Sequence, residues 1–180
     1  EFREDVRNNQ IEEKVLNAHQ RYLGKSVRQA EIRSWKNSLP YMSSLLEDDG
    51  IPDNSGIAIE YNIPFGNKRI DFIVTGINEE NQKSVVIVEL KQWETASLTD
   101  KDGIVKTYVG KPDNEVIHPS RQAWTYAALL RDYNEVVQVQ RISLHPCAYL
   151  HNMVSETEIK NSHYKTDIDK APVFIRNDVQ

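Results

Sequence analysis

The hydrophobic and polar positions of this chain follow two different periods, and the change of period separates two kinds of predicted element. From Phe2 to Ala18, and again from Ile32 to Leu46, apolar residues recur at roughly helical spacing. From Ile57 onwards they alternate with other residues or form short β-branched runs, which is typical of strands. We therefore expect helices first and a sheet after them.

Three residues predict where the helices begin, end or bend. Gly24 suits the left-handed conformation that closes many helices, so the first helix is expected to end there. Ser26 can accept hydrogen bonds from the first turn of a helix and is expected to cap the second one. Pro40 lacks an N–H group and clashes with the preceding turn, so it is expected to kink or divide that helix.

Three consecutive strands are predicted next. Ile57–Pro64 alternates apolar residues with others, and Arg69–Thr75 does the same before Gly76 ends it. The β-branched run Val85–Val88 opens the third strand, which continues through Glu89-Leu90-Lys91.

The remainder predicts a helix, a further strand and irregular segments. Proline favours the first turn of a helix, so a helix is expected to open at His118-Pro119-Ser120. Connections as long as Gln92–His118 are usually functional or disordered. We also expect strands at Ile104–Val109, Ile142–Leu150 and Ala171–Ile175, and a polar linker at Lys160–Lys170. The pattern as a whole predicts an α/β fold with a central mixed sheet flanked by helices.

The candidate chemistry lies where the second and third strands face each other. Side chains alternate along a strand, so Glu89 and Lys91 point to one face and Leu90 to the other. If residues 76 and 84 pair across an antiparallel hairpin, Asp71 lies opposite Glu89 with Cβ atoms about 5 Å apart. Two carboxylates so close raise each other's pKa unless a cation lies between them. This register predicts a divalent metal site.

The predicted ligands are the carboxylates of Asp71 and Glu89 and the backbone carbonyl of Leu90. Oxygen donors of this kind, with water and phosphate oxygens, suit Mg²⁺ or Mn²⁺. The Lys91 ammonium can stabilise charge on a phosphate or position the attacking water. The pattern predicts metal-assisted phosphodiester hydrolysis, although an E-x-K sequence alone is usually a solvated strand face.

These residues resemble a known superfamily. Asp71 followed by Glu89-x-Lys91 on the next strand resembles the PD-(D/E)XK nucleases, with Ile70 in the place of the proline. Gln122 and Tyr126 resemble the Q-x-x-x-Y element of RecB-type nucleases. The resemblance implies a restriction-endonuclease-like fold, Mg²⁺ or Mn²⁺ as cofactor, DNA rather than RNA as substrate, and a supporting catalytic role for Gln122.

A narrower similarity extends over roughly residues 30 to 152. It resembles the nuclease-like N-terminal domain of bacterial proteins that continue into a Schlafen-like P-loop helicase, and it rests on Glu60-Tyr61, Arg69–Phe72, Glu89–Trp93 and His118-Pro119-Ser120. This implies a helicase domain in the same native chain, of which the present sequence is an excised part. It also leaves a second function open: a catalytically silent, nuclease-shaped module that binds nucleic acid for the helicase.

The sequence leaves open whether Glu31 or Glu60 supplies a further carboxylate to the metal site. In nucleases of this type the helix before the first core strand often lends one, and Glu31 is preferred there to Glu13. The alternative for Glu31 is a solvated helix glutamate. Glu60 is either a ligand of the metal, directly or through another group, or a residue on the wet side of an outer strand.

Composition limits the partners. The net charge of −5 argues against indiscriminate binding to nucleic acid, so any basic surface must be local. The candidate contacts are Lys68, Arg69, Lys106 and Tyr126, with Lys101 and Lys111 beside acidic neighbours that favour a merely solvated loop. With one cysteine, Cys147, and no apolar span, a cytoplasmic protein is expected. Its expected layout is one domain over 1–180, made of helices (1–50), a catalytic core (57–152) and a polar extension (153–180).

Overall fold

The fold is described by a computed structural model, which covers residues 1–24, 26–63, 68–108 and 114–179. Internal contacts divide the chain into two compact units, Glu1–Asp53 and Asn54–Gln180. The boundary falls between the predicted helices and the predicted core. That the whole chain is one domain stays a prediction, and each unit is described by itself.

The described residues of the first unit form three helices where the sequence predicts two: α1 (Phe2–Arg7), α2 (Ile11–Leu23) and α3 (Gln29–Leu45). The chain breaks between α1 and α2 at Asn9, whose φ of 54° is left-handed. Asparagine adopts that conformation more readily than most residues, so the prediction of one continuous first helix is wrong. The predicted end is confirmed, since Gly24 closes α2 with a φ of 61°.

Helix α3 corrects two predictions. Its N-cap is Arg28 rather than Ser26, and the carboxylate of Glu31 accepts the backbone N–H of Arg28 at 3.1 Å. Pro40 lies inside one continuous helix, so it does not divide α3. The buried side chains of Leu39 and Met42 flank the proline and hold that turn in place against a cost of about 3 kcal/mol.

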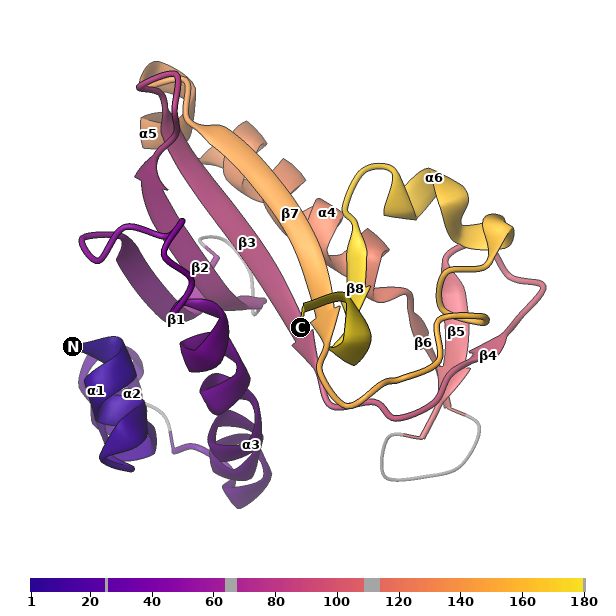
Figure 1. Cartoon of the computed structure of the whole chain (residues 1–180), viewed down its shortest axis with the longest axis horizontal. Coiled ribbons are helices and arrows are strands. Elements are labelled where there is room, and N and C mark those ends of the chain that lie inside the picture. Colours follow the sequence, from indigo (N-terminus) through magenta and orange to yellow (C-terminus); the bar gives the residue numbers. More distant parts are fainter. Residues whose placement is uncertain (25, 64–67, 109–113, 180) are drawn as a thin grey trace. The chain divides into compact units, whose positions relative to one another are not determined.

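The second unit is built on a five-stranded sheet, which confirms the α/β class and the central mixed sheet (Figure 1). The strand order is β1-β2-β3-β7-β8. Strand β2 is antiparallel to both of its neighbours, β1 and β3, whereas β3, β7 and β8 run parallel. The strands are β1 (Gly56–Asn62), β2 (Arg69–Ile77), β3 (Lys83–Lys91), β7 (Ser143–Leu150) and β8 (Val173–Ile175).

The register of β2 and β3 is the predicted one. Gly76 pairs with Ser84, and the ladder continues as far as Phe72 and Val88. One step further along the same register, Asp71 lies opposite Glu89. The predicted register of the hairpin is therefore confirmed, and it positions the candidate carboxylates. The strand does not end at Gly76, because β2 continues to Ile77, which pairs with Lys83.

Helix α4 (Pro119–Tyr133) supplies the crossover that a parallel pair such as β3 and β7 requires. It lies along one face of these two strands, and α5 (Glu135–Val139) leads from its end to β7 (Figure 1). Its buried residues recur every three or four positions, as an amphipathic helix requires: Pro119, Ser120, Ala123, Tyr126, Ala127 and Leu130.

The long segment after β3 is not a structureless loop. It forms a second, three-stranded antiparallel sheet of β4 (Ser97–Leu98), β5 (Ile104–Thr107) and β6 (Asn114–Ile117). Val105 of β5 is fully buried in a cluster with residues of β7 and β8, so the small sheet is packed against the core at this position. The predicted strand ended at Val109, which lies outside the described residues.

The C-terminal segment is not a polar linker. Ile159 and Tyr164 are fully buried in the same cluster, and Tyr164 ends the short helix η1 (Ser162–Tyr164), which α6 (Lys165–Ile168) follows directly. Their burial outweighs the polar composition on which the prediction rested. The last predicted strand is confirmed as β8, and η2 (Arg176–Val179) ends the described chain. No helix among the described residues has the length and apolar character needed to cross a membrane.

Candidate functional site

Three carboxylates align across neighbouring strands on the face that α4 covers. Glu60 lies opposite Asp71, because the flanking residues of β1 and β2 pair in that register. Asp71 in turn lies opposite Glu89 on β3. Directly opposed residues point to the same face of a sheet, so the strands bring these side chains to one row.

Glu89 is the buried centre of this row. Its side chain is 2% exposed, and its Oε1 accepts a hydrogen bond of 2.6 Å from the Lys91 ammonium. The other oxygen, Oε2, has no hydrogen-bond partner among the described residues. The Lys91 ammonium also lies 5.6 Å from the centre of the Trp93 ring, so an aromatic face shields it on one side.

Asp71 is held beside Glu89 by the backbone. The Leu90 N–H donates to Oδ2 of Asp71 at 2.8 Å. Burial and the negative charge of Glu89 raise the pKa of Asp71 to about 8, although Lys91 opposes the shift. Burial also raises the pKa of Glu89, again against the effect of Lys91. Without a cation, the pair therefore retains a proton at neutral pH.

Glu60 makes a different contact. Its Oε2 lies 3.2 Å from Nε of Arg69, in an ion pair whose side chains are 14% and 27% exposed. Its negative charge nevertheless contributes to the raised pKa of Glu89. Glu60 thus lies close enough to the carboxylate pair to act on its charge, while its own carboxylate forms an ion pair with Arg69 of β2.

Helix α4 adds two polar side chains above the carboxylates. Nε2 of Gln122 donates to the Tyr126 hydroxyl at 2.8 Å, across one turn of the helix. Burial, followed by the charge of Glu89, raises the pKa of Tyr126 to about 12. The Tyr126 hydroxyl therefore stays protonated and lies close enough to the pair to sense its charge.

The start of α4 is fixed by a buried histidine that the sequence argument did not assign to this task. Nδ1 of His118 accepts the Ser120 N–H at 3.2 Å, so Nε2 carries the proton and donates to the Ile159 carbonyl at 2.9 Å. The ring stacks on Tyr164 with centroids 4.6 Å apart. Burial lowers the pKa of His118, which keeps it neutral. The sequence signal was the H-P-S start of the helix.

Arg121 provides a second anchor. Its Nε donates to both carboxylate oxygens of the buried Asp167, at 3.1 and 3.0 Å, and its Nη2 donates to Asp102 at 2.8 Å. The guanidinium lies against Gly103, where an added Cβ would be 2.0 Å from Cζ of Arg121. These contacts tie the helix that carries Gln122 to the small sheet and to the C-terminal segment.

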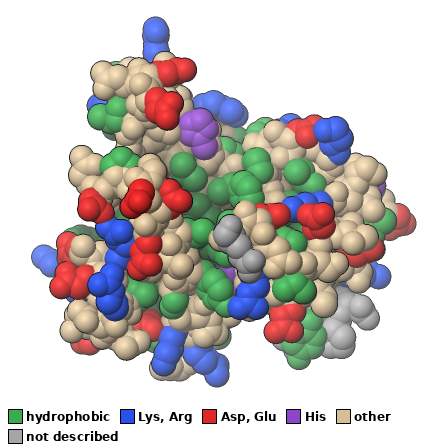
Figure 2. Space-filling view, viewed as in Figure 1, with side chains coloured by type: hydrophobic (Ala, Val, Ile, Leu, Met, Phe, Trp, Pro, Cys, Tyr) green, Lys and Arg blue, Asp and Glu red, His purple; other side chains and the backbone are tan. Residues whose placement is uncertain are grey.

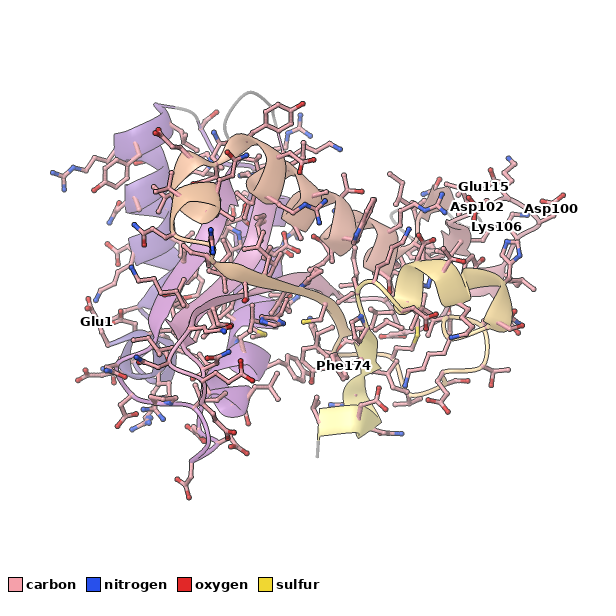
Figure 3. All side chains as sticks on the ribbon, turned by 90° about the horizontal axis from the view of Figure 1, so that it is seen from above. Glu1, Asp100, Asp102, Lys106, Glu115 and Phe174 are labelled. Carbon is pink, nitrogen blue, oxygen red and sulfur yellow. The ribbon has the colours of Figure 1, made fainter. Side chains whose placement is uncertain are left out.

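The remaining predicted residues lie elsewhere. Glu31 belongs to the first unit, where its carboxylate closes the start of α3. Lys68 is exposed just before β2. Lys106 lies on the small sheet of the second unit, opposite Glu115. It is near Asp100 and Asp102 at one end of the second unit (Figure 3).

Two further lysines of the predicted contact set do not add to a basic surface. Lys101 forms an ion pair with Glu115, and Lys111 lies outside the described residues. On the face shown in Figure 2, the described Lys and Arg side chains are scattered among Asp and Glu. This agrees with the negative net charge of the chain.

The site fits a small hard cation in its chemistry. Asp71 and Glu89 offer carboxylate oxygens, of which Oε2 of Glu89 is buried and without a hydrogen-bond partner in the described chain. Among the described residues, no three His, Cys, Asp or Glu side chains come together as a ready metal cage. Magnesium needs no such cage, because it is commonly held by one or two carboxylates together with water and phosphate oxygens.

Comparison with known proteins adds no assignment. No protein-family model, no curated protein and no solved structure matches this chain.

Proposed function

We propose that the unit from Asn54 onwards is a restriction-endonuclease-like domain that hydrolyses phosphodiester bonds of DNA with Mg²⁺ or Mn²⁺. The observation that carries the proposal is the opposition of Asp71 and Glu89 at the end of a strand pair, with Lys91 bound to Glu89. The order of three antiparallel strands, a crossover helix and a parallel strand also supports it.

Each residue has a defined task in this proposal. Asp71 and Glu89 bind the cation, which supplies charge stabilisation and a more acidic water when it is present. Lys91 holds its positive charge beside the carboxylates, where it stabilises the charge that develops on the phosphate. Gln122 donates to the Tyr126 hydroxyl, which senses the charge of the pair, and in the proposal this hydroxyl helps to orient the bound groups. The carbonyl of Leu90 is the proposed backbone ligand.

The deciding experiment incubates the full chain with supercoiled plasmid, single-stranded DNA and RNA, each with Mg²⁺, Mn²⁺ or EDTA. We expect metal-dependent cleavage of DNA that EDTA stops. The matched control is Glu89→Gln, purified identically, because it preserves the shape of the side chain and reveals any contaminating nuclease. Binding without cleavage on every substrate would instead identify the silent module that serves an attached helicase.

A further inference from the structure

Glu60 has a backbone conformation that its position in the fold does not explain. Four described residues other than glycine have a positive φ. Asn9, Asn81 and Arg141 lie in turns or bends, whereas Glu60, with a φ of 55°, lies inside strand β1. The ladder to β2 includes both of its neighbours and omits Glu60 itself. Such strained backbone persists mainly at functional sites.

The strained residue faces a cation on the same side of the sheet. Arg69 lies two positions before Asp71 on β2, so the register makes it the diagonal neighbour of Glu60. The Glu60 carboxylate meets Nε of Arg69 at 3.2 Å, and both side chains are largely withdrawn from solvent. The contact to Nε restrains the guanidinium from one side.

The guanidinium is part of the candidate site. The positive charge of Arg69 acts on the Tyr126 hydroxyl of α4, which also senses Asp71 and Glu89. A planar guanidinium presents several N–H donors in a fork that matches the oxygens of a phosphate. Glu60 and Arg69 therefore place a phosphate-binding group beside the carboxylate pair.

We propose that Glu60 is a positioning residue that holds Arg69 for a phosphate oxygen of the nucleic-acid strand, and that Glu60 is not a metal ligand. The inference rests on the proposed function in one respect, namely that the ligand is a phosphodiester. Phosphate binding by Arg69 needs no cleavage, so it is measured separately.

The test compares DNA binding by the full chain and its variants in EDTA, using fluorescence anisotropy of labelled single-stranded and duplex oligonucleotides. We expect Arg69→Gln and Glu60→Gln each to weaken binding about tenfold, the loss of one charge-assisted hydrogen bond, and the double variant to be no weaker. Arg131→Gln is the control, since it removes the same charge from the exposed end of α4. It should bind within about twofold of the unchanged protein.

Glu60→Gln separates positioning from simple electrostatics. The change removes a negative charge, so general attraction to DNA would make binding tighter, whereas loss of the Arg69 orientation makes it weaker. Tighter or unchanged binding overturns the proposal, as does absence of DNA binding by the unchanged protein. The proposal is also overturned if Glu60→Gln abolishes the rise in melting temperature that Mn²⁺ gives the unchanged protein. That rise should survive in the variant, because the proposal holds that Glu60 is not a metal ligand.

Glu60→Gly gives a second readout. Glycine adopts a positive φ without strain, so this variant should melt at or above the unchanged protein while its DNA binding falls. A lower melting temperature with full DNA binding would make Glu60 a purely structural residue and overturn the inference. The inference and the proposed function can be contradicted separately. If DNA binding depends on Glu60 but no DNA is cleaved, only the proposed nuclease activity is wrong. If DNA is cleaved but binding does not depend on Glu60, only the positioning role of Glu60 is wrong.

Discussion

The ammonium of Lys91 lies 2.6 Å from Oε1 of Glu89, two positions before it on the same strand. Successive residues of a strand point to opposite faces, so an x-K step after a glutamate is the shortest sequence that can make this pair. Because Glu89 is buried, Lys91 is at once a candidate catalytic group and the counter-charge that makes an ionised Glu89 tolerable.

Lys91→Ala should therefore abolish cleavage and also destabilise the fold, by about 3 kcal/mol at pH 8, because it leaves a buried carboxylate without its partner. The loss should shrink as the pH falls, because the pKa of Glu89 is raised and a protonated carboxyl needs no counter-charge. Thermal melts in EDTA at pH 8 and below measure the effect. The double change Lys91→Ala with Glu89→Gln should recover the stability but not the activity.

Asp71→Asn tests the pH dependence of the pair. The pKa of Asp71 is raised to about 8 in the folded state, against about 4 in the unfolded chain. Between these two pH values the folded state therefore binds more protons than the unfolded chain. Stability of the metal-free protein should then fall as pH rises from about 4 to about 8, and Asp71→Asn should flatten that fall.

The same variant tests the metal site. Asp71→Asn should melt at or above the unchanged protein in EDTA at pH 8, yet gain little from Mg²⁺ or Mn²⁺. The unchanged protein should gain about 1.4 kcal/mol at a metal concentration ten times Kd. An equal metal-induced gain in both proteins would contradict the assignment of Asp71 as a ligand.

Asp71→Ala and Glu89→Ala should each reduce cleavage to background, because they remove parts of one site. A double variant should be scarcely worse than either single one. Single-turnover rates on plasmid measure this, and far-ultraviolet circular dichroism controls for the fold. Full activity of Glu89→Ala would refute the proposed site.

Gln122→Ala should slow cleavage less than these changes, since Gln122 acts through the hydroxyl of Tyr126 at 2.8 Å. Tyr126→Phe removes the same hydrogen bond from its other side. The two changes together should cost no more than the larger single one, in a double-mutant cycle of cleavage rates. Additive losses would show that the two side chains act separately.

Gly103→Ala should destabilise the protein by roughly 2–4 kcal/mol, because alanine is strained at a φ of 63° and its Cβ meets Arg121. Gly24→Ala is the matched control: its φ of 61° is alike, and nothing lies within 4 Å of the added Cβ. It should cost only about 1–2 kcal/mol. Urea unfolding measures both, and equal losses would mean that contact with Arg121 contributes nothing.

The central part of the fold follows from local pattern. The β-branched run before Glu89 and the turn that pairs Gly76 with Ser84 specify the hairpin register, and Pro119 specifies the start of α4. These features depend on residues close together in sequence. The same is true of the opposition of Asp71 and Glu89, which needs only the hairpin.

What the pattern missed depends on residues far apart in sequence. Tyr164 lies in a polar stretch, yet its contact with His118 and its hydrogen bond to the Ile104 carbonyl help to make the C-terminal segment part of the core. The ion pair of Arg121 with Asp167 also joins residues far apart in sequence, so neither residue alone predicts it. Glu60 pairs with Arg69 through a strained φ that no propensity predicts.

The parallel pairing of β3 with β7 also bears on how the chain folds. The three strands of the β1–β3 meander are neighbours in sequence, whereas the small sheet and α4 lie between β3 and its other neighbour, β7. Contacts so distant in sequence close slowly. In refolding from urea, we therefore expect pulsed hydrogen exchange to protect the amides shared by β1, β2 and β3 before those shared by β3 and β7.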